Sequence, residues 1–125
     1  MKKDVIIVLV LGFFVGALSY WFNPYGTSKA FGTSIYTVLS IGGLASSFCV
    51  TFLLKLKPIL VPIFMVIGLN SAVMARIVFD TIFWDPTSHN LMPFELLQFG
   101  LITSIVSLIG TFLAVFIKWF ISIVR

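Results

Sequence analysis

Four side chains that can transfer protons or bind a metal ion lie within sixteen positions of one another. They are Asp80, Asp85, His89 and Glu95, and His89 is the only histidine of the chain. Carboxylate oxygens and an imidazole nitrogen are ligands that Zn²⁺ and Mn²⁺ accept in proteins. The spacing matches no compact ligand motif, however. Asp85, His89 and Glu95 are therefore weak metal candidates, and we expect no bound metal or cofactor.

Turn and helix-end chemistry offers the same residues another role. Asp85 precedes Pro86, an order typical of a helix N-cap followed by the first helical residue. Asn90 can cap a following helix, which would place Glu95 close to the positive end of the helix dipole. A histidine beside carboxylates can act as a general base. Because no activated nucleophile accompanies it, we expect no enzymatic activity.

Arg76 and Asp80 are four residues apart on a predicted helix and can form an ion pair across one turn. Arg76 follows Ile59, the first residue of its apolar run, by 17 positions. At 1.5 Å per residue this is about 25 Å, close to the far edge of a membrane's hydrocarbon layer. A charged residue there is either a functional residue or an anchor that reaches the headgroups.

Asn70 falls near the middle of the same apolar run. A side-chain amide at that depth needs hydrogen-bond partners, which other helices usually supply. We expect Thr103 or Ser104 to be the partner, which would make Asn70 a link between helices. Coordination of a solute or an ion is the alternative.

The composition shows in which environment these side chains act. Of 125 residues, 60% are hydrophobic and only 10% are charged, whereas a soluble domain carries about 25% charged residues. A small soluble domain cannot bury so many apolar side chains. A soluble enzyme, a disordered tail and a disulfide-stapled secreted module are therefore excluded.

Four apolar runs are each close to the roughly 20 residues that cross a bilayer. We predict helices at residues 5–22, 33–54, 59–79 and 94–121, with an outer loop at 80–93. The first run follows two lysines, as in a signal peptide, but it continues through Tyr20 and Trp21, so we expect it to be retained. The predicted fold is all-α, a single-domain integral membrane bundle of four transmembrane helices.

The basic residues predict the orientation of this bundle. With a cytoplasmic amino terminus, Lys29 and Arg76 fall outside, and the remaining six Lys and Arg residues fall inside. Cytoplasmic loops carry the excess of Lys and Arg, so we expect both termini in the cytoplasm. The net charge of +4 then reflects orientation, and we expect no nucleic-acid partner. The six inside residues are Lys2, Lys3, Lys55, Lys57, Lys118 and Arg125.

Small residues recur at helical spacing in all four runs. Helices in lipid associate by close packing of such residues, so the pattern predicts a tight bundle that also self-associates. The residues are Gly12, Gly16 and Ser19 in the first run, Gly43 and Ser47 in the second, Gly68 and Ala72 in the third, and Thr103, Ser107, Gly110 and Ala114 in the fourth.

In length and number of spans, the chain resembles the small multidrug-resistance transporters. That family carries an essential glutamate in the middle of its first span. The corresponding run here, residues 5–22, has no ionisable residue before the interface. The resemblance therefore covers the architecture and does not extend to the mechanism.

Two functions fit these features. The first is an oligomeric transporter or channel for a small solute or a cation, since four spans enclose little space and the predicted outer loop is acidic. The second is a non-enzymatic accessory subunit or assembly factor of a membrane complex. The expected partners are the lipid bilayer and further copies or another membrane protein, in a bacterial inner or cell membrane. The candidate functional residues are Asn70, Arg76, Asp80, Asp85, His89 and Glu95.

Overall fold

The computed structural model describes residues 2–21, 29–30, 33–83 and 92–125, which form a helical bundle with one short hairpin. Helix α1 (Lys2–Gly16) continues into a π-helical turn, η1 (Ala17–Trp21). Two-residue strands, β1 (Lys29–Ala30) and β2 (Thr33–Ser34), pair in an antiparallel arrangement. The remaining helices are α2 (Ile35–Leu53), α3 (Leu60–Phe83) and α4 (Met92–Val124).

Four of the described helical segments are long and apolar enough to cross a membrane, which confirms the predicted all-α class and number of candidate spans. The boundaries differ most at α3, which continues four residues beyond its predicted end at Phe79. Asp80 interrupts the apolar run, but its carboxylate is paired with Arg76 on the same helix face. Thr81 donates its hydroxyl to the Ile77 carbonyl at 2.8 Å. The polar residues therefore continue the helix instead of starting the predicted loop.

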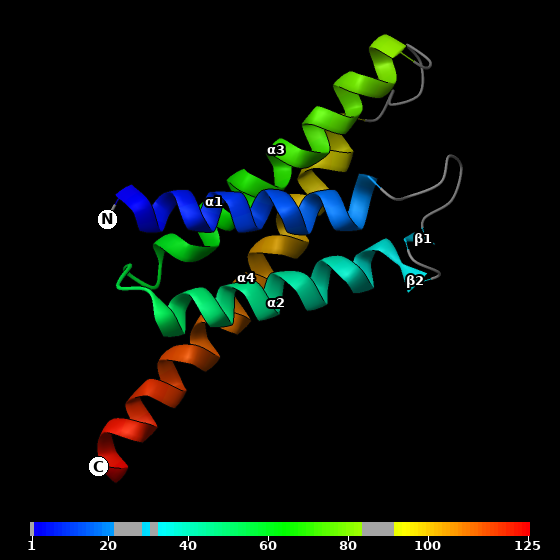
Figure 1. Ribbon diagram of the computed structural model, residues 1–125. Coiled ribbons are helices and arrows are strands. Elements are labelled where there is room, and N and C mark those ends of the chain that lie inside the picture. Colours follow the sequence, from blue (N-terminus) through cyan, green and yellow to red (C-terminus); the bar gives the residue numbers. More distant parts are fainter. Residues whose placement is uncertain (1, 22–28, 31–32, 84–91) are drawn as a thin grey trace.

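The helices form two pairs that cross obliquely. In Figure 1, α1 and α2 lie side by side and run in opposite directions, while α3 and α4 cross them at a slant. The extensive contacts are those of α1 with α3, α2 with α4, and α3 with α4. The start of α1, the α2–α3 connection and the end of α4 lie at one end of the molecule, and η1, the hairpin and the start of α4 lie at the other (Figure 1).

Glycines bring the helix backbones into direct contact. A methyl group on Gly12 of α1 would lie 2.6 Å from the carbonyl oxygen of Met65 in α3. A methyl group on Gly110 of α4 would lie 2.5 Å from the carbonyl oxygen of Leu44 in α2. Both distances are far shorter than an ordinary contact, so these positions require a residue without a Cβ. The small residues therefore pack the bundle tightly, as the sequence predicts.

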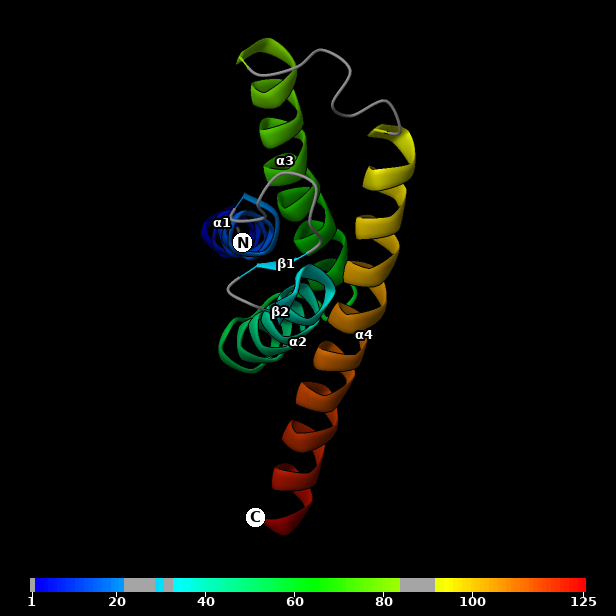
Figure 2. The ribbon, with the colours of Figure 1, turned by 90° about the vertical axis from the view of Figure 1, so that its right-hand side faces the viewer.

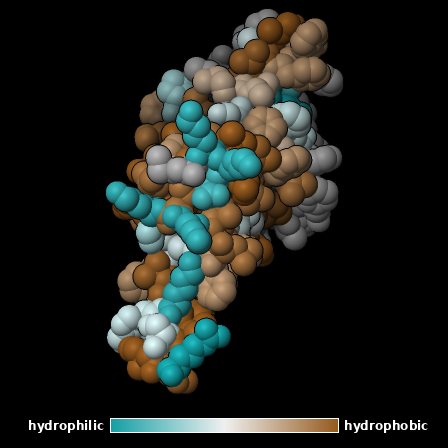
Figure 3. Space-filling model, turned by 60° about the vertical axis from the view of Figure 1, so that its left-hand side comes forward, coloured by the Kyte–Doolittle hydropathy of each residue, from teal (hydrophilic) through white to brown (hydrophobic). Residues whose placement is uncertain are grey.

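The exposed basic residues gather at the end where α1 starts. Figure 3, turned so that this side comes forward, shows hydrophilic residues grouped across that end. We call it the basic end. Its exposed cations are Lys2, Lys3, Lys55, Lys57, Lys118 and Arg125.

Candidate functional site

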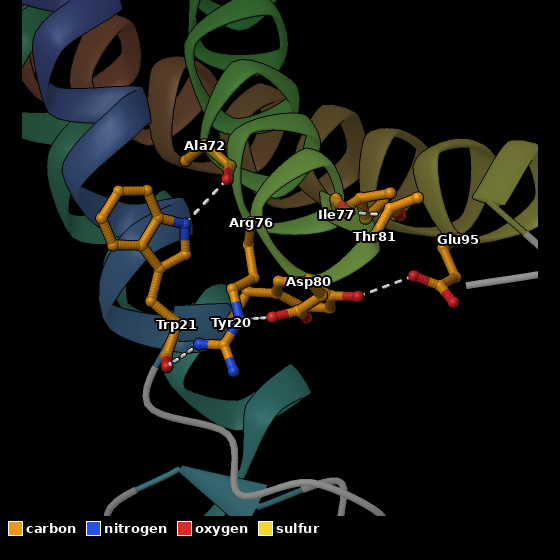
Figure 4. A network of polar contacts seen from close by, with 8 residues as sticks. All are labelled: Tyr20, Trp21, Ala72, Arg76, Ile77, Asp80, Thr81 and Glu95. Atoms are coloured by element: carbon orange, nitrogen blue, oxygen red, sulfur yellow. Dashed lines mark hydrogen bonds and ion pairs between the residues drawn. The ribbon is translucent and has the colours of Figure 1, made fainter. Parts of the chain in front are cut away.

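Three of the predicted site residues, Arg76, Asp80 and Glu95, meet at the end of the bundle opposite the basic end. They come from α3 and from the first turn of α4, and they lie beside η1 (Figure 4). Tyr20 and Trp21 of η1 join them. We call these five residues the Arg76 network.

The predicted ion pair across one turn of α3 is present. The Nε atom of Arg76 lies 2.8 Å from Oδ1 of Asp80. Asp80 is only 5% exposed, whereas 24% of the Arg76 side chain remains exposed. A carboxylate buried this deeply needs a partner of opposite charge, and Arg76 supplies one.

Arg76 also binds the end of the first span. Its Nη1 donates a hydrogen bond to the carbonyl oxygen of Trp21, the last residue of η1 (Figure 4). The final carbonyls of a helix have no partner within the helix and carry partial negative charge. Neither α1 nor η1 has a basic residue in its last turn. Arg76 therefore provides the positive charge that this helix end lacks.

The side chain of Trp21 makes a second link to α3. Its indole Nε1 donates to the carbonyl oxygen of Ala72 at 2.8 Å, one turn before Arg76. The edge of the same indole meets the ring of Phe13, with centroids 5.7 Å apart. Trp21 thus contacts α3 through its backbone carbonyl and through its side chain, which fixes the end of the first span against α3.

Tyr20 connects the first span to α4. Its hydroxyl donates to Oε2 of Glu95 at 2.6 Å, although the two residues are 75 positions apart in the sequence. The tyrosine ring is 8% exposed and meets the ring of Phe99 edge to face, with centroids 5.2 Å apart. The Arg76 network therefore joins η1, α3 and α4.

The π-helical turn places Tyr20 and Trp21 toward different helices. A π-helix usually consists of a single turn within or beside an α-helix, and such turns occur frequently at functional sites. Here the adjacent residues bind α4 and α3, respectively. The hydroxyl of Ser19 donates to the Gly16 carbonyl at 3.1 Å and stays within its own helix.

The chemistry available to this network is limited. Its charged groups pair with an opposite charge, a hydroxyl or a helix end. Within residues 2–21, 29–30, 33–83 and 92–125, no three His, Cys, Asp or Glu side chains come together as a metal site. Asp85 and His89 lie outside the described residues, as does Asn90. The predicted metal set and the predicted helix caps therefore stay predictions.

The predicted partners of Asn70 are wrong. Thr103 donates to the Phe99 carbonyl at 2.7 Å, and Ser104 donates to the Gly100 carbonyl at 2.8 Å. In the described part of the chain, the buried Oδ1 of Asn70 has no hydrogen-bond partner. The amide lies against Gly100, where an added methyl group would be 3.2 Å from Nδ2. The prediction fails because a hydroxyl in a membrane helix can bind its own backbone one turn back.

Two further hydroxyls of the bundle follow the same rule. Ser47 donates to the Gly43 carbonyl, and Ser71 donates to the Ile67 carbonyl at 2.7 Å. Such hydroxyls are no longer available as donors to a passing solute. Among the described residues, the buried Oγ of Ser107 has no hydrogen-bond partner, and the same holds for Oδ1 of Asn70.

A second cation caps a helix end at the basic end. Lys118 of α4 donates from Nζ to the carbonyl oxygen of Thr51 at 2.7 Å, in the last turn of α2. Its ammonium also lies 5.7 Å from the centroid of the Phe52 ring. Like η1, α2 has no basic residue in its own last turn. The sequence analysis did not predict the contributions of Tyr20, Trp21 and Lys118. The signal that could have indicated the two caps is the lack of a basic residue in the last turn of each of these helices.

Comparisons of the chain with protein families, with curated proteins and with solved structures found no match.

Proposed function

We propose that this chain is a multi-pass membrane protein with its basic end in the cytoplasm. The gathering of exposed cations at the basic end supports this orientation, because Lys and Arg are enriched on the cytoplasmic side. The lengths of α1 with η1 and of α2 support the crossing of a membrane, since 20 and 19 residues correspond to about 30 Å of helix.

Within that membrane, the protein acts as a non-enzymatic interaction subunit, and its partner binds the face of α3 and α4 around Asn70. The observation that carries this proposal is the state of the Asn70 amide. The side chain is partly exposed, and its Oδ1 is enclosed without a partner among the described residues. It lies ten residues after the start of α3 at Leu60, or about 15 Å along the helix, close to the middle of a bilayer.

An unsatisfied polar group in a dry environment costs free energy, about 1–3 kcal/mol. Rotation about χ2 exchanges the positions of Oδ1 and Nδ2, so either group can turn toward a neighbour. A second helix with a free donor or acceptor can therefore pair with the amide group that faces outward. Gly100 lets the amide pack close against α4, because an added methyl group there would lie only 3.2 Å from Nδ2. Interhelical hydrogen bonds of this kind are common in membrane proteins.

The Arg76 network also supports the assignment as an interaction subunit, because its own contacts are internal to the bundle. Its charges stabilise contacts among η1, α3 and α4 within one copy. The function therefore resides in contacts that the bundle makes with other helices, and the network holds the bundle in the shape that makes them.

Cross-linking tests the proposal. A photoreactive residue at Ile67 or Met74, both exposed and within one turn of Asn70, should capture a membrane protein partner in native membranes. A photoreactive residue at Phe14, which is exposed on α1, is the control position. Capture from Ile67 should require the amide and should be lost on Asn70→Leu.

The same substitution separates a binding role from a structural one. Because Asn70→Leu removes an unpaired amide, the isolated bundle should be as stable as the wild type or more stable. The matched control, Ser71→Leu, alters the neighbouring exposed position and should leave capture unchanged. Capture that survives Asn70→Leu, or a clear loss of stability with unchanged capture, would refute the proposal.

Transport or channel activity is the second candidate, and the same amide favours it. Two copies that meet at their Asn70 faces would place two amides at mid-membrane depth, where they can coordinate a cation or a small polar solute. Flux of K⁺ and Na⁺ into proteoliposomes tests this role. Flux that falls on Asn70→Leu supports transport, whereas no flux from the wild type supports the interaction subunit.

A further inference from the structure

The end of α4 projects beyond the other helices (Figures 1 and 2). All residues from 115 to 125 are exposed. We call residues 119–125, which follow Lys118, the α4 extension. Trp119, Phe120, Ile121, Ile123 and Val124 make most of its surface apolar, while Ser122 and Arg125, three residues apart, lie on the remaining side.

The contact of Lys118 fixes the level at which this extension begins. Its ammonium binds the Thr51 carbonyl in the last turn of α2. Lys55 and Lys57 follow shortly after the end of α2, and both are exposed. If the bundle inserts as proposed, this is the level at which hydrocarbon gives way to headgroups. The α4 extension therefore starts at the membrane boundary.

The length of α4 also places the extension at the membrane boundary if the bundle inserts as proposed. Its 33 residues span about 50 Å, while the 19 residues of α2 span about 28 Å, close to the hydrocarbon thickness. The seven residues of the extension account for about 10 Å. On a path perpendicular to the membrane they would carry apolar side chains into water. Because α4 crosses α1 and α2 obliquely (Figure 1), the extension can instead stay within the boundary layer.

We propose that the α4 extension lies in the boundary between headgroups and acyl chains at the basic end and is bound there by anionic phospholipid. This inference rests on the proposed membrane insertion. Helices with one apolar and one polar face bind this layer by burying the apolar face about 5–10 Å deep, and tryptophan is enriched in it. Six exposed cations surround the extension's end of the molecule, against one acidic residue, Asp4. That charge attracts anionic headgroups and disfavours a basic protein partner.

Spin labels test the position of the α4 extension. Single cysteines at Phe120, Ile121 and Ile123, in a Cys49→Ala background, sample different sides of the helix. Cysteines at Ile105 and Lys57 serve as the apolar and aqueous controls, since both residues are exposed. In vesicles of phosphatidylcholine and phosphatidylglycerol, the ratio of oxygen to nickel-chelate collision rates at all three positions should lie between those of the two controls.

Three results would overturn the proposal. A ratio equal to that of the Lys57 label would place the extension in water. Low collision rates with both reagents would mean that protein covers it, from a second copy or another chain. An unchanged ratio in vesicles of phosphatidylcholine alone would exclude a role for anionic lipid. Failure of the proposed insertion is recognisable separately, because the Ile105 label would then also report water.

Discussion

Gly12→Ala should destabilise the bundle, because it forces apart two helix backbones. The added methyl group would lie 2.6 Å from the Met65 carbonyl oxygen and 3.2 Å from the Leu69 nitrogen. An ordinary contact begins at 3.4 Å, so α1 and α3 must separate by about 0.8 Å. Both obstructing atoms belong to the backbone of a helix, and neither can move aside alone.

Gly42→Ala is the matched control. The nearest atom to its added methyl group is Cγ1 of Val15, at 3.1 Å, and a side-chain methyl can yield by a few tenths of an ångström. Both substitutions gain a similar helix propensity, about 1 kcal/mol. The difference between the two variants therefore isolates the cost of the backbone clash, which for overpacking is about 1–3 kcal/mol.

The assay is reversible unfolding by SDS titration in mixed micelles, followed by circular dichroism. Gly12→Ala should unfold at a lower SDS fraction than Gly42→Ala. Adding Gly68→Ala to Gly12→Ala should cost less than the two single effects combined, because one separation of α1 from α3 relieves both contacts. Equal stability of Gly12→Ala and Gly42→Ala would refute direct backbone contact between α1 and α3.

The Arg76 network gives three further predictions, measured by the same titration. Tyr20→Phe removes the hydrogen bond to the Glu95 carboxylate and keeps the ring, so it should cost about 1.5–3 kcal/mol; a change below about 0.5 kcal/mol would contradict that bond. Asp80→Leu leaves Arg76 uncompensated and should cost somewhat less than the roughly 3–5 kcal/mol of a fully buried broken pair, since Arg76 is partly exposed. Adding Arg76→Met should recover part of that loss, and a further loss equal to the first would argue against the pair. At the basic end, away from the network, Thr111→Val removes the hydroxyl that accepts from Thr51 at 3.3 Å and should cost only about 0.6 kcal/mol. A loss of stability as large as that of Tyr20→Phe would contradict the expectation that this neutral hydrogen bond is weaker than the one to the Glu95 carboxylate.

Local periodicity explains why much of the fold was predictable. Apolar runs of bilayer length identified four candidate spans, and glycine spacing identified the faces that pack. The Arg76–Asp80 pair was predictable because residues four apart always share a helix face. Each of these features depends on neighbours along a single helix.

Contacts between helices were beyond that reasoning. Nothing local indicates that Tyr20 meets Glu95, 75 positions away, because that contact depends on how three helices cross. Asn70 shows the opposite error. Its place near the middle of α3 was predictable, but the partner assigned to it had a competing acceptor on its own helix, the Phe99 carbonyl that Thr103 binds.

The path of the chain across the membrane is the claim on which these assignments depend. Lys57 and Phe83 lie on either side of α3, at its two ends, and both are exposed. Each can be replaced by cysteine in a Cys49→Ala background and treated with a membrane-impermeant maleimide in vesicles of known orientation. The account predicts that right-side-out vesicles label position 83 and not position 57, and that inside-out vesicles label 57 and not 83. Labelling of both positions from one side would contradict it.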